Sequence, residues 1–185
     1  MIKVLKYSCC FFSMLVLFGC DQKNGPAEEQ TQNAPALLDN EAVLYLVDDY
    51  WANPFEFGNP TIANIRDQMG GDIVLDKQPF QNRNNPAQID TVVTLKIDAS
   101  KFVFYKGVDY EIFYYASVQD DRIKFERNIY IGCSKKHFAN QFKEIKGKFE
   151  LPDVIQVGNA ERLDIFNFIF QNERLATVIY DGNID

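Results

Sequence analysis

Large apolar residues recur every three or four positions in three stretches of the chain, 41–51, 60–69 and 134–144. That spacing places them on one face of an amphipathic helix. Pro60 suits the first turn of the second helix, and Ser134 is a favourable N-cap for the third. The pattern therefore predicts three helices, with a strand over 42–47 as the alternative for the first.

Runs of β-branched, aromatic and alternating residues follow. They predict strands at 73–75, 91–97, 102–105, 110–118, 123–125, 149–157, 163–170 and 175–180. The polar segments between them, such as QNRNNP at 81–86, are typical of turns. Few connections are long enough for a parallel crossover. We therefore expect an α+β fold in which helices pack on one face of an antiparallel β-sheet.

Two segments of the chain also resemble each other. Residues 69–75 (MGGDIVL) align with 145–151 (IKGKFEL), and 91–107 align with 165–182 after one gap. The offset stays at about 75 residues, as expected for an internal repeat. The sequence thus predicts two helix–three-strand repeats, at about 59–107 and 132–182, within one globular domain spanning 39–185. Chance similarity between apolar strands is the alternative.

The first twenty residues have a different pattern. Lys3 and Lys6 precede a short apolar run at 11–18, which is too short to span a bilayer. The run ends in LFGC at 17–20, which resembles the lipobox of bacterial lipoproteins. That resemblance implies a signal peptide at 1–19, cleavage before Cys20, and an acylated Cys20 that anchors the protein in a membrane. Residues 21–38, rich in Gln, Asn, Pro and Glu, then predict a flexible tether.

The resemblance to a lipobox implies a location in the bacterial cell envelope. Asp21 follows the lipidated cysteine and resembles the inner-membrane retention signal of enteric bacteria. That rule does not hold across all bacteria, and we expect the outer membrane rather than the inner one. Of the four cysteines, Cys9 and Cys10 leave with the signal peptide, so that Cys133 alone remains beside Cys20. No internal disulfide is expected, and Cys133 is interpreted as a buried residue in preference to a reactive thiol.

Charge narrows the choice of partner. The chain has 19 basic and 26 acidic residues and a formal net charge of −7. Cleavage removes two lysines and no acid, which leaves 17 basic residues against 26 acidic ones, a net charge of −9. Nucleic acid is an unsuitable partner, because phosphate binding needs a basic face. A cationic protein would be attracted.

Candidate catalytic chemistry is sparse. His137 is the only histidine, and it lies one turn from Ser134 without a recognisable third group or oxyanion motif. The paired carboxylates at 48–49 and 120–121 fit a helix surface and a turn better than a catalytic couple. We therefore predict no catalytic residue, no metal ligand and no cofactor.

Aromatic residues are the remaining candidates for function. Tyr50, Trp51, Phe55 and Phe57 cluster around a Pro-Gly break, and Tyr115 lies beside Tyr114 in a predicted strand. Because Tyr and Trp are enriched in interface hot spots, these five residues form a candidate interaction surface. The alternative is that they belong to the core.

The segment IGCSKKHFANQF at 131–142 carries a family resemblance. Its Gly132, Ser134, Phe138 and Phe142 resemble the Gly-x-Ser helix entry of small envelope lipoproteins of the SmpA/OmlA type and of tandem-repeat β-lactamase inhibitory proteins. The resemblance covers about the last third of the chain. It implies a binding scaffold that acts through a sheet face and loops, and it transfers no binding residue.

Three functions remain open. The first is a lipid-anchored envelope interaction or scaffold module without catalytic activity, bound to another envelope protein. The alternative is an inhibitor or immunity protein that binds a cationic envelope-attacking hydrolase such as a lysozyme. The third is a hydrolase or small-ligand carrier with a carboxylate-lined cleft.

Overall fold

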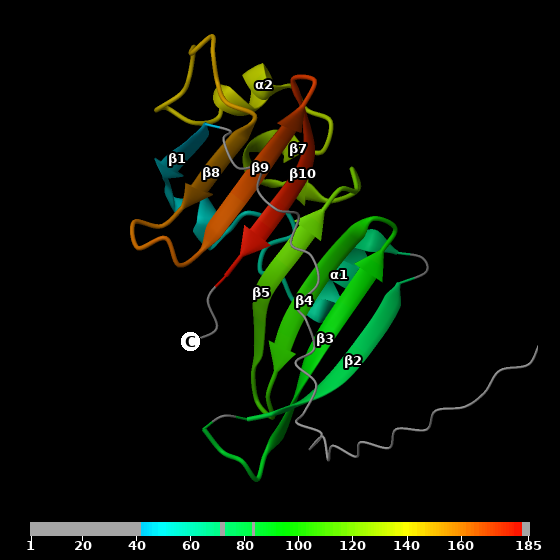
Figure 1. Ribbon diagram of the computed structural model, residues 1–185. Coiled ribbons are helices and arrows are strands. Elements are labelled where there is room, and N and C mark those ends of the chain that lie inside the picture. The colour runs from blue at the N-terminus through cyan, green and yellow to red at the C-terminus, as the bar shows by residue number, and fades with distance from the viewer. Residues whose placement is uncertain (1–41, 71–72, 83, 183–185) are drawn as a thin grey trace, which may run out of the picture. The chain divides into compact units, whose positions relative to one another are not determined.

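The computed structural model describes residues 42–70, 73–82 and 84–182. Their main element is an eight-stranded sheet with the strand order β1-β8-β9-β10-β5-β4-β3-β2 (Figure 1). A small second sheet pairs β6 with β7. The strand bounds are β1 Val43–Val47, β2 Val74–Gln81, β3 Ile89–Ile97, β4 Ser100–Lys106, β5 Glu111–Val118, β6 Lys124–Phe125, β7 Ile129–Tyr130, β8 Val154–Gly158, β9 Ile165–Gln171 and β10 Arg174–Asp181.

The large sheet is mixed. β1 runs parallel to β8, with Leu46 opposite Val157. All its other pairs are antiparallel: β2 to β5 form one meander and β8 to β10 another. The two meanders join where β10 pairs with β5, with Val178 opposite Val118.

The helical elements are short. They are α1 (Ile62–Met69), α2 (Lys135–Ala139) and the 3₁₀ turns η1 (Asp49–Ala52) and η2 (Glu126–Asn128). The hydroxyl of Thr61 accepts a hydrogen bond from Asn64 N at 3.0 Å, and that of Ser134 accepts one from His137 N at 3.1 Å. Each cap satisfies a backbone N–H group that the first turn of a helix leaves free.

The predicted fold class is wrong. Residues 42–70, 73–82 and 84–182 are mostly β and contain two α-helices, of 8 and 5 residues. The large sheet is mixed instead of antiparallel, and the structure is not a pair of helix–three-strand repeats under packed helices. The predicted helix at 41–51 is β1 followed by η1, and the predicted helix at 134–144 is α-helical only to Ala139.

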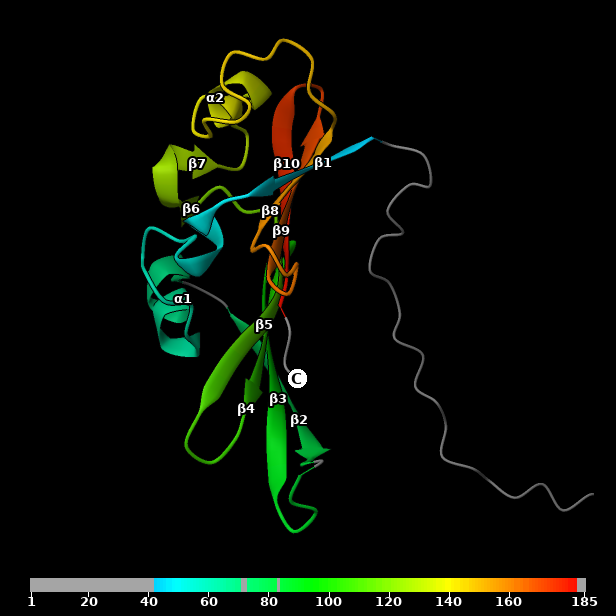
Figure 2. The same ribbon diagram turned by 90° about the vertical axis from the view of Figure 1, so that its left-hand side faces the viewer.

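The core lies on one face of the sheet, which η1, α1, the β6–β7 pair and α2 cover (Figure 2). Phe166, Phe168 and Phe170 of β9 point into it and are at most 2% exposed. Phe138 packs on Phe168 with ring centroids 4.7 Å apart, and Tyr50 meets Phe168 edge-on at 5.8 Å. We call this side of the sheet the covered face.

The alternate residues of the same strands lie on the opposite side. Cross-strand register places Tyr115, Asp181 and Ile165 together there, whereas Ala116, Tyr180 and Phe166 share the covered face. No helix or strand among the described residues packs over this second side (Figure 2). We call it the bare face.

The predicted signal peptide at 1–19, Cys20 and the tether at 21–38 lie outside the described residues. Within the part of the chain that is described, no helix is both long enough and apolar enough to cross a membrane.

Candidate functional site

The five aromatic residues singled out in the sequence occupy different environments. Tyr50 and Phe55 are 3% and 0% exposed, so they are core residues and not part of an exposed surface. Phe57 is half-buried and stacks on Phe55 at 4.9 Å. Trp51 is half-buried beside a cavity, and Tyr115 is half-buried on the bare face. The structure therefore separates them into a core pair and two different candidate surfaces.

Trp51 borders a cavity of about 310 Å³ at the covered face. η1 and the turn before α1 form one wall, and β5, β9 and β10 form the other. We call it the aromatic pocket. Its lining residues are Trp51, Ala52, Pro54, Asn59, Pro60, Thr61, Glu111, Ile112, Phe113, Asp164, Phe166 and Tyr180.

A stack of three rings forms one wall of the aromatic pocket. Tyr180 lies between Phe113, at 4.8 Å and an interplanar angle of 11°, and Phe166, at 4.6 Å and 29°. Phe55 contacts Phe113 and Phe166 edge-on from the core. Burial and the hydrogen bond to Asp164 raise the pKa of Tyr180 well above its usual value, so its hydroxyl stays protonated.

Two carboxylates are fixed in the same wall. Asp164 accepts hydrogen bonds from Tyr180 Oη at 2.8 Å and from Asn159 Nδ2 at 3.3 Å. Glu111 Oε1 accepts the backbone N–H of Ile62 at 2.8 Å, at the start of α1. All three donors are neutral. Among the described residues, neither carboxylate forms an ion pair.

Two glycines allow the close approaches at this end of the sheet. A Cβ atom on Gly158 would lie 2.4 Å from the carbonyl oxygen of Asp164. A Cβ atom on Gly182 would lie 2.3 Å from the hydroxyl of Tyr180. The positions of Asp164 and Tyr180 therefore require residues without a side chain, glycines, at 158 and 182.

The bare face offers a different surface. Around its centre lie Tyr115, Ile165, Asn167, Ile169, Thr177 and Ile179. Gln156 Nε2 donates to Asn167 Oδ1 at 2.8 Å, which ties β8 to β9. Lys101 lies with Nζ 5.5 Å from the centre of the Tyr115 ring. Tyr115 therefore lies between two charged residues, Lys101 and Asp181, and the rest of this face along β9 and β10 is aliphatic, hydroxyl and amide in character.

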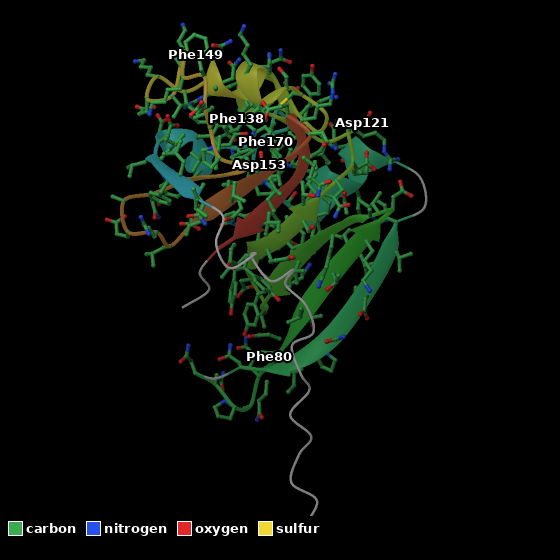
Figure 3. All side chains as sticks on the ribbon, turned by 45° about the horizontal axis from the view of Figure 1, so that its top comes forward. Phe80, Asp121, Phe138, Phe149, Asp153 and Phe170 are labelled. Atoms are coloured by element: carbon green, nitrogen blue, oxygen red, sulfur yellow. The ribbon has the colours of Figure 1, made fainter. Side chains whose placement is uncertain are left out.

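A second cavity, of about 640 Å³, lies beside α2. Lys135 is 4% exposed at its wall, and its Nζ contacts Asp153 Oδ1 at 2.5 Å and Glu173 Oε1 at 2.9 Å. Phe149 on its rim is fully exposed. It lies away from Phe138 and Phe170, which pack together over β9 (Figure 3). Because acidic partners already satisfy Lys135, this cavity presents no uncompensated buried charge.

The residues considered for catalysis have structural partners. Ser134 caps α2, and His137 Nε2 lies 2.8 Å from the carbonyl oxygen of Asn128. Cys133 is 2% exposed, and burial raises the pKa of its thiol. Asp48 pairs with Arg127. Within the described ranges, no three His, Cys, Asp or Glu side chains are grouped so that they could hold a metal ion.

Comparison with known proteins gives no relative: no family model, no curated protein and no solved structure matches the chain. Sequence reasoning found Trp51 but missed Glu111, Asp164 and Tyr180, which lie far apart along the chain. Gly158 and Gly182, each placed at the end of a predicted strand, were the available signal of a close approach.

Proposed function

We propose that this chain is a lipid-anchored, non-catalytic protein-binding module of the bacterial cell envelope. The lipobox-like LFGC at 17–20 and the polar segment at 21–38 support the anchor and the tether. The single observation that carries the binding role is the bare face of the eight-stranded sheet.

The chemistry of the bare face fits a protein partner with an uncharged, partly apolar surface. The centres of protein interfaces are depleted of charged residues and enriched in aromatic ones. Tyr115 supplies a ring with a polar tip beside Asp181, and Ile169 and Ile179 supply aliphatic area on the neighbouring strands β9 and β10. Both sides of such a sheet are usually packed when its strands are apolar on both faces. The partner would complete that packing.

The experiment compares three forms of the tagged full-length protein in cells: wild type, Cys20→Ala and Tyr115→Ser. We expect the mature wild-type protein to start at an acylated Cys20 by mass spectrometry and to crosslink to one envelope protein. Cys20→Ala should leave the membrane fraction, and Tyr115→Ser should stay anchored but lose the crosslink. An unmodified Cys20, or a crosslink that persists in Tyr115→Ser, would contradict the proposal.

A second candidate function is inhibition of a cationic envelope-attacking hydrolase. The observation in its favour is the pair of carboxylates at the aromatic pocket together with the net charge of −7. Opposite charge accelerates association and makes it depend on ionic strength. The test is inhibition of purified lysozymes at low and physiological salt. Inhibition that weakens with salt supports this function, and no inhibition at either salt rejects it.

A further inference from the structure

We infer that the aromatic pocket binds one cationic side chain, a lysine or an arginine, presented by the protein partner. The inference rests on the proposed binding function and deepens it by naming the chemistry of the contact. It concerns the covered-face end of β5, β9 and β10 and not the bare face.

Aromatic rings line the pocket and can attract a cation. A lysine or arginine is attracted to the face of an aromatic ring within about 6 Å, and tryptophan is the strongest partner. Trp51 lines the cavity together with the Phe113–Tyr180–Phe166 stack, in which both faces of the Tyr180 ring are already covered, so Trp51 is the ring that would attract the cation. Arginine stacks on an aromatic ring elsewhere in this molecule, where Arg162 Cζ lies 4.2 Å from the centre of the Tyr45 ring.

Two carboxylates at the pocket are available to a cation. Asp164 and Glu111 are held at the pocket by neutral donors, and no described lysine or arginine pairs with them. Arg162, two residues from Asp164, is stacked on Tyr45 instead. A cation entering the pocket would therefore gain charge-assisted hydrogen bonds without displacing an existing ion pair.

The size of the cavity limits what enters. Its volume of about 310 Å³ is at the lower end of the range of about 300–1,000 Å³ for small-molecule sites. One long side chain suits such a volume better than a large cofactor. The larger cavity beside α2 differs, because Glu173 in its lining is already paired with Lys135, and Lys136 and Lys148 also line it.

Trp51 makes the inference directly measurable, because it is the only tryptophan in the chain. The probe is an end-blocked Gly-Gly-Arg-Gly-Gly peptide titrated into the full-length protein in detergent, with its neutral citrulline analogue as the matched ligand. We expect a saturable change in tryptophan emission with the arginine peptide and at least a fivefold weaker response with the citrulline peptide. Equal responses to both peptides, or no response to either, would overturn the inference.

Two isosteric variants identify the site. Asp164→Asn keeps an acceptor for Tyr180 and gives up only the longer bond from Asn159, and Glu111→Gln keeps an acceptor for Ile62, so each removes mainly a charge. Each should raise the Kd of the arginine peptide about tenfold, which equals about 1.4 kcal/mol. Asp76→Asn, an exposed carboxylate on β2, is the control with the same charge change and should leave the Kd within twofold. Unchanged affinity in both pocket variants would overturn the inference.

The two proposals fail in distinguishable ways. The peptide titration requires no partner protein and no lipid anchor. A crosslink that depends on Tyr115, combined with no peptide binding, would overturn the cation pocket and leave the bare-face proposal standing. Saturation by a neutral disaccharide but not by the arginine peptide would also overturn it, because the pocket would then recognise a sugar.

Discussion

The two faces of β9 differ in what their residues do. On the covered face Phe166, Phe168 and Phe170 are at most 2% exposed and pack under α2 and η1. On the bare face Ile165 and Ile169 alternate with them and are half-buried, with only neighbouring strands around them among the described residues. The covered face therefore carries the burial that stabilises the fold, and the bare face keeps apolar side chains that are only half-buried.

The largest expected effect is a difference in stability between substitutions at two adjacent positions of β9, 168 on the covered face and 169 on the bare face. Phe168→Ala removes a fully buried ring, and we expect a loss of about 3–5 kcal/mol in the free energy of unfolding. Ile169→Ala, on the other face, should cost about 1 kcal/mol. Urea unfolding of both variants measures the contrast. Equal losses would mean that the bare face is packed as tightly as the core.

A second prediction concerns the end of β8, where Gly158 allows the chain before β9 to approach closely. Gly158→Ala brings a Cβ atom to 2.4 Å from the backbone oxygen of Asp164 and 2.9 Å from the hydroxyl of Tyr45. The backbone at Asp164 must shift to relieve this contact, so we expect the free energy of unfolding to fall by about 1–3 kcal/mol. Ala160→Gly, in the adjacent exposed turn, is the control. A thermal midpoint equal to that of the wild type would show that the strand ends are free to separate.

A third prediction concerns the attachment of η1 to the covered face. Arg127 Nη2 contacts Asp48 Oδ1 at 2.7 Å, and its guanidinium lies 5.0 Å from the centre of the Phe142 ring. Burial acts to raise the pKa of Asp48, but the hydrogen bonds and charge of Arg127 outweigh it and lower that pKa below its ordinary 3.8. Arg127→Ala should therefore cost about 1 kcal/mol at pH 7.

The pH dependence of that cost has a definite sign. The Asp48 carboxyl stabilises the fold above its ordinary pKa and loses that contribution as the pH falls through the lowered value. The difference between wild type and Arg127→Ala should therefore shrink between pH 7 and pH 2 in urea unfolding. A difference that stays constant would assign the effect to packing on Phe142 and not to the ion pair.

The smallest expected effect on stability is at Thr177, at the centre of the bare face. Thr177→Ala should change the free energy of unfolding by no more than about 0.5 kcal/mol, because it removes a half-buried hydroxyl and methyl. Under the proposed function it should nevertheless weaken partner crosslinking. Wild-type crosslinking would restrict the binding surface to the neighbourhood of Tyr115.

Local signals in the sequence predicted most of the strands and α1. The β-branched run at 91–97, the apolar and aromatic run at 163–170 and the helical spacing of apolar residues at 60–69 are each patterns that neighbouring residues alone determine. The helix preferred over 41–51 was wrong and the alternative strand over 42–47 was right, because five apolar-rich residues suit a strand or a helix equally, and pairing with β8 decides between them. At 134–144, Phe142 and Ile145 are buried as a helix pattern requires, but the chain reaches them through turns.

The aromatic pocket was less accessible to sequence reasoning. Its carboxylates and rings come from η1, β5, β9 and β10, so only the strand order brings Glu111, Asp164 and Tyr180 together. Trp51 was recognisable because tryptophan is frequent at interfaces, but nothing local separated it from the buried Tyr50 beside it. Residue type alone does not specify which side of an element faces the core.

The most direct test of the central claim is site-specific photo-crosslinking in cells. A photoreactive residue at position 169 samples the bare face, and one at the exposed position 136 of α2 samples the covered side away from the aromatic pocket. We predict that position 169 captures one envelope protein at a defined mass, that position 136 does not, and that the capture disappears in Cys20→Ala. Capture of the same protein from position 136 but not from position 169 would contradict the account.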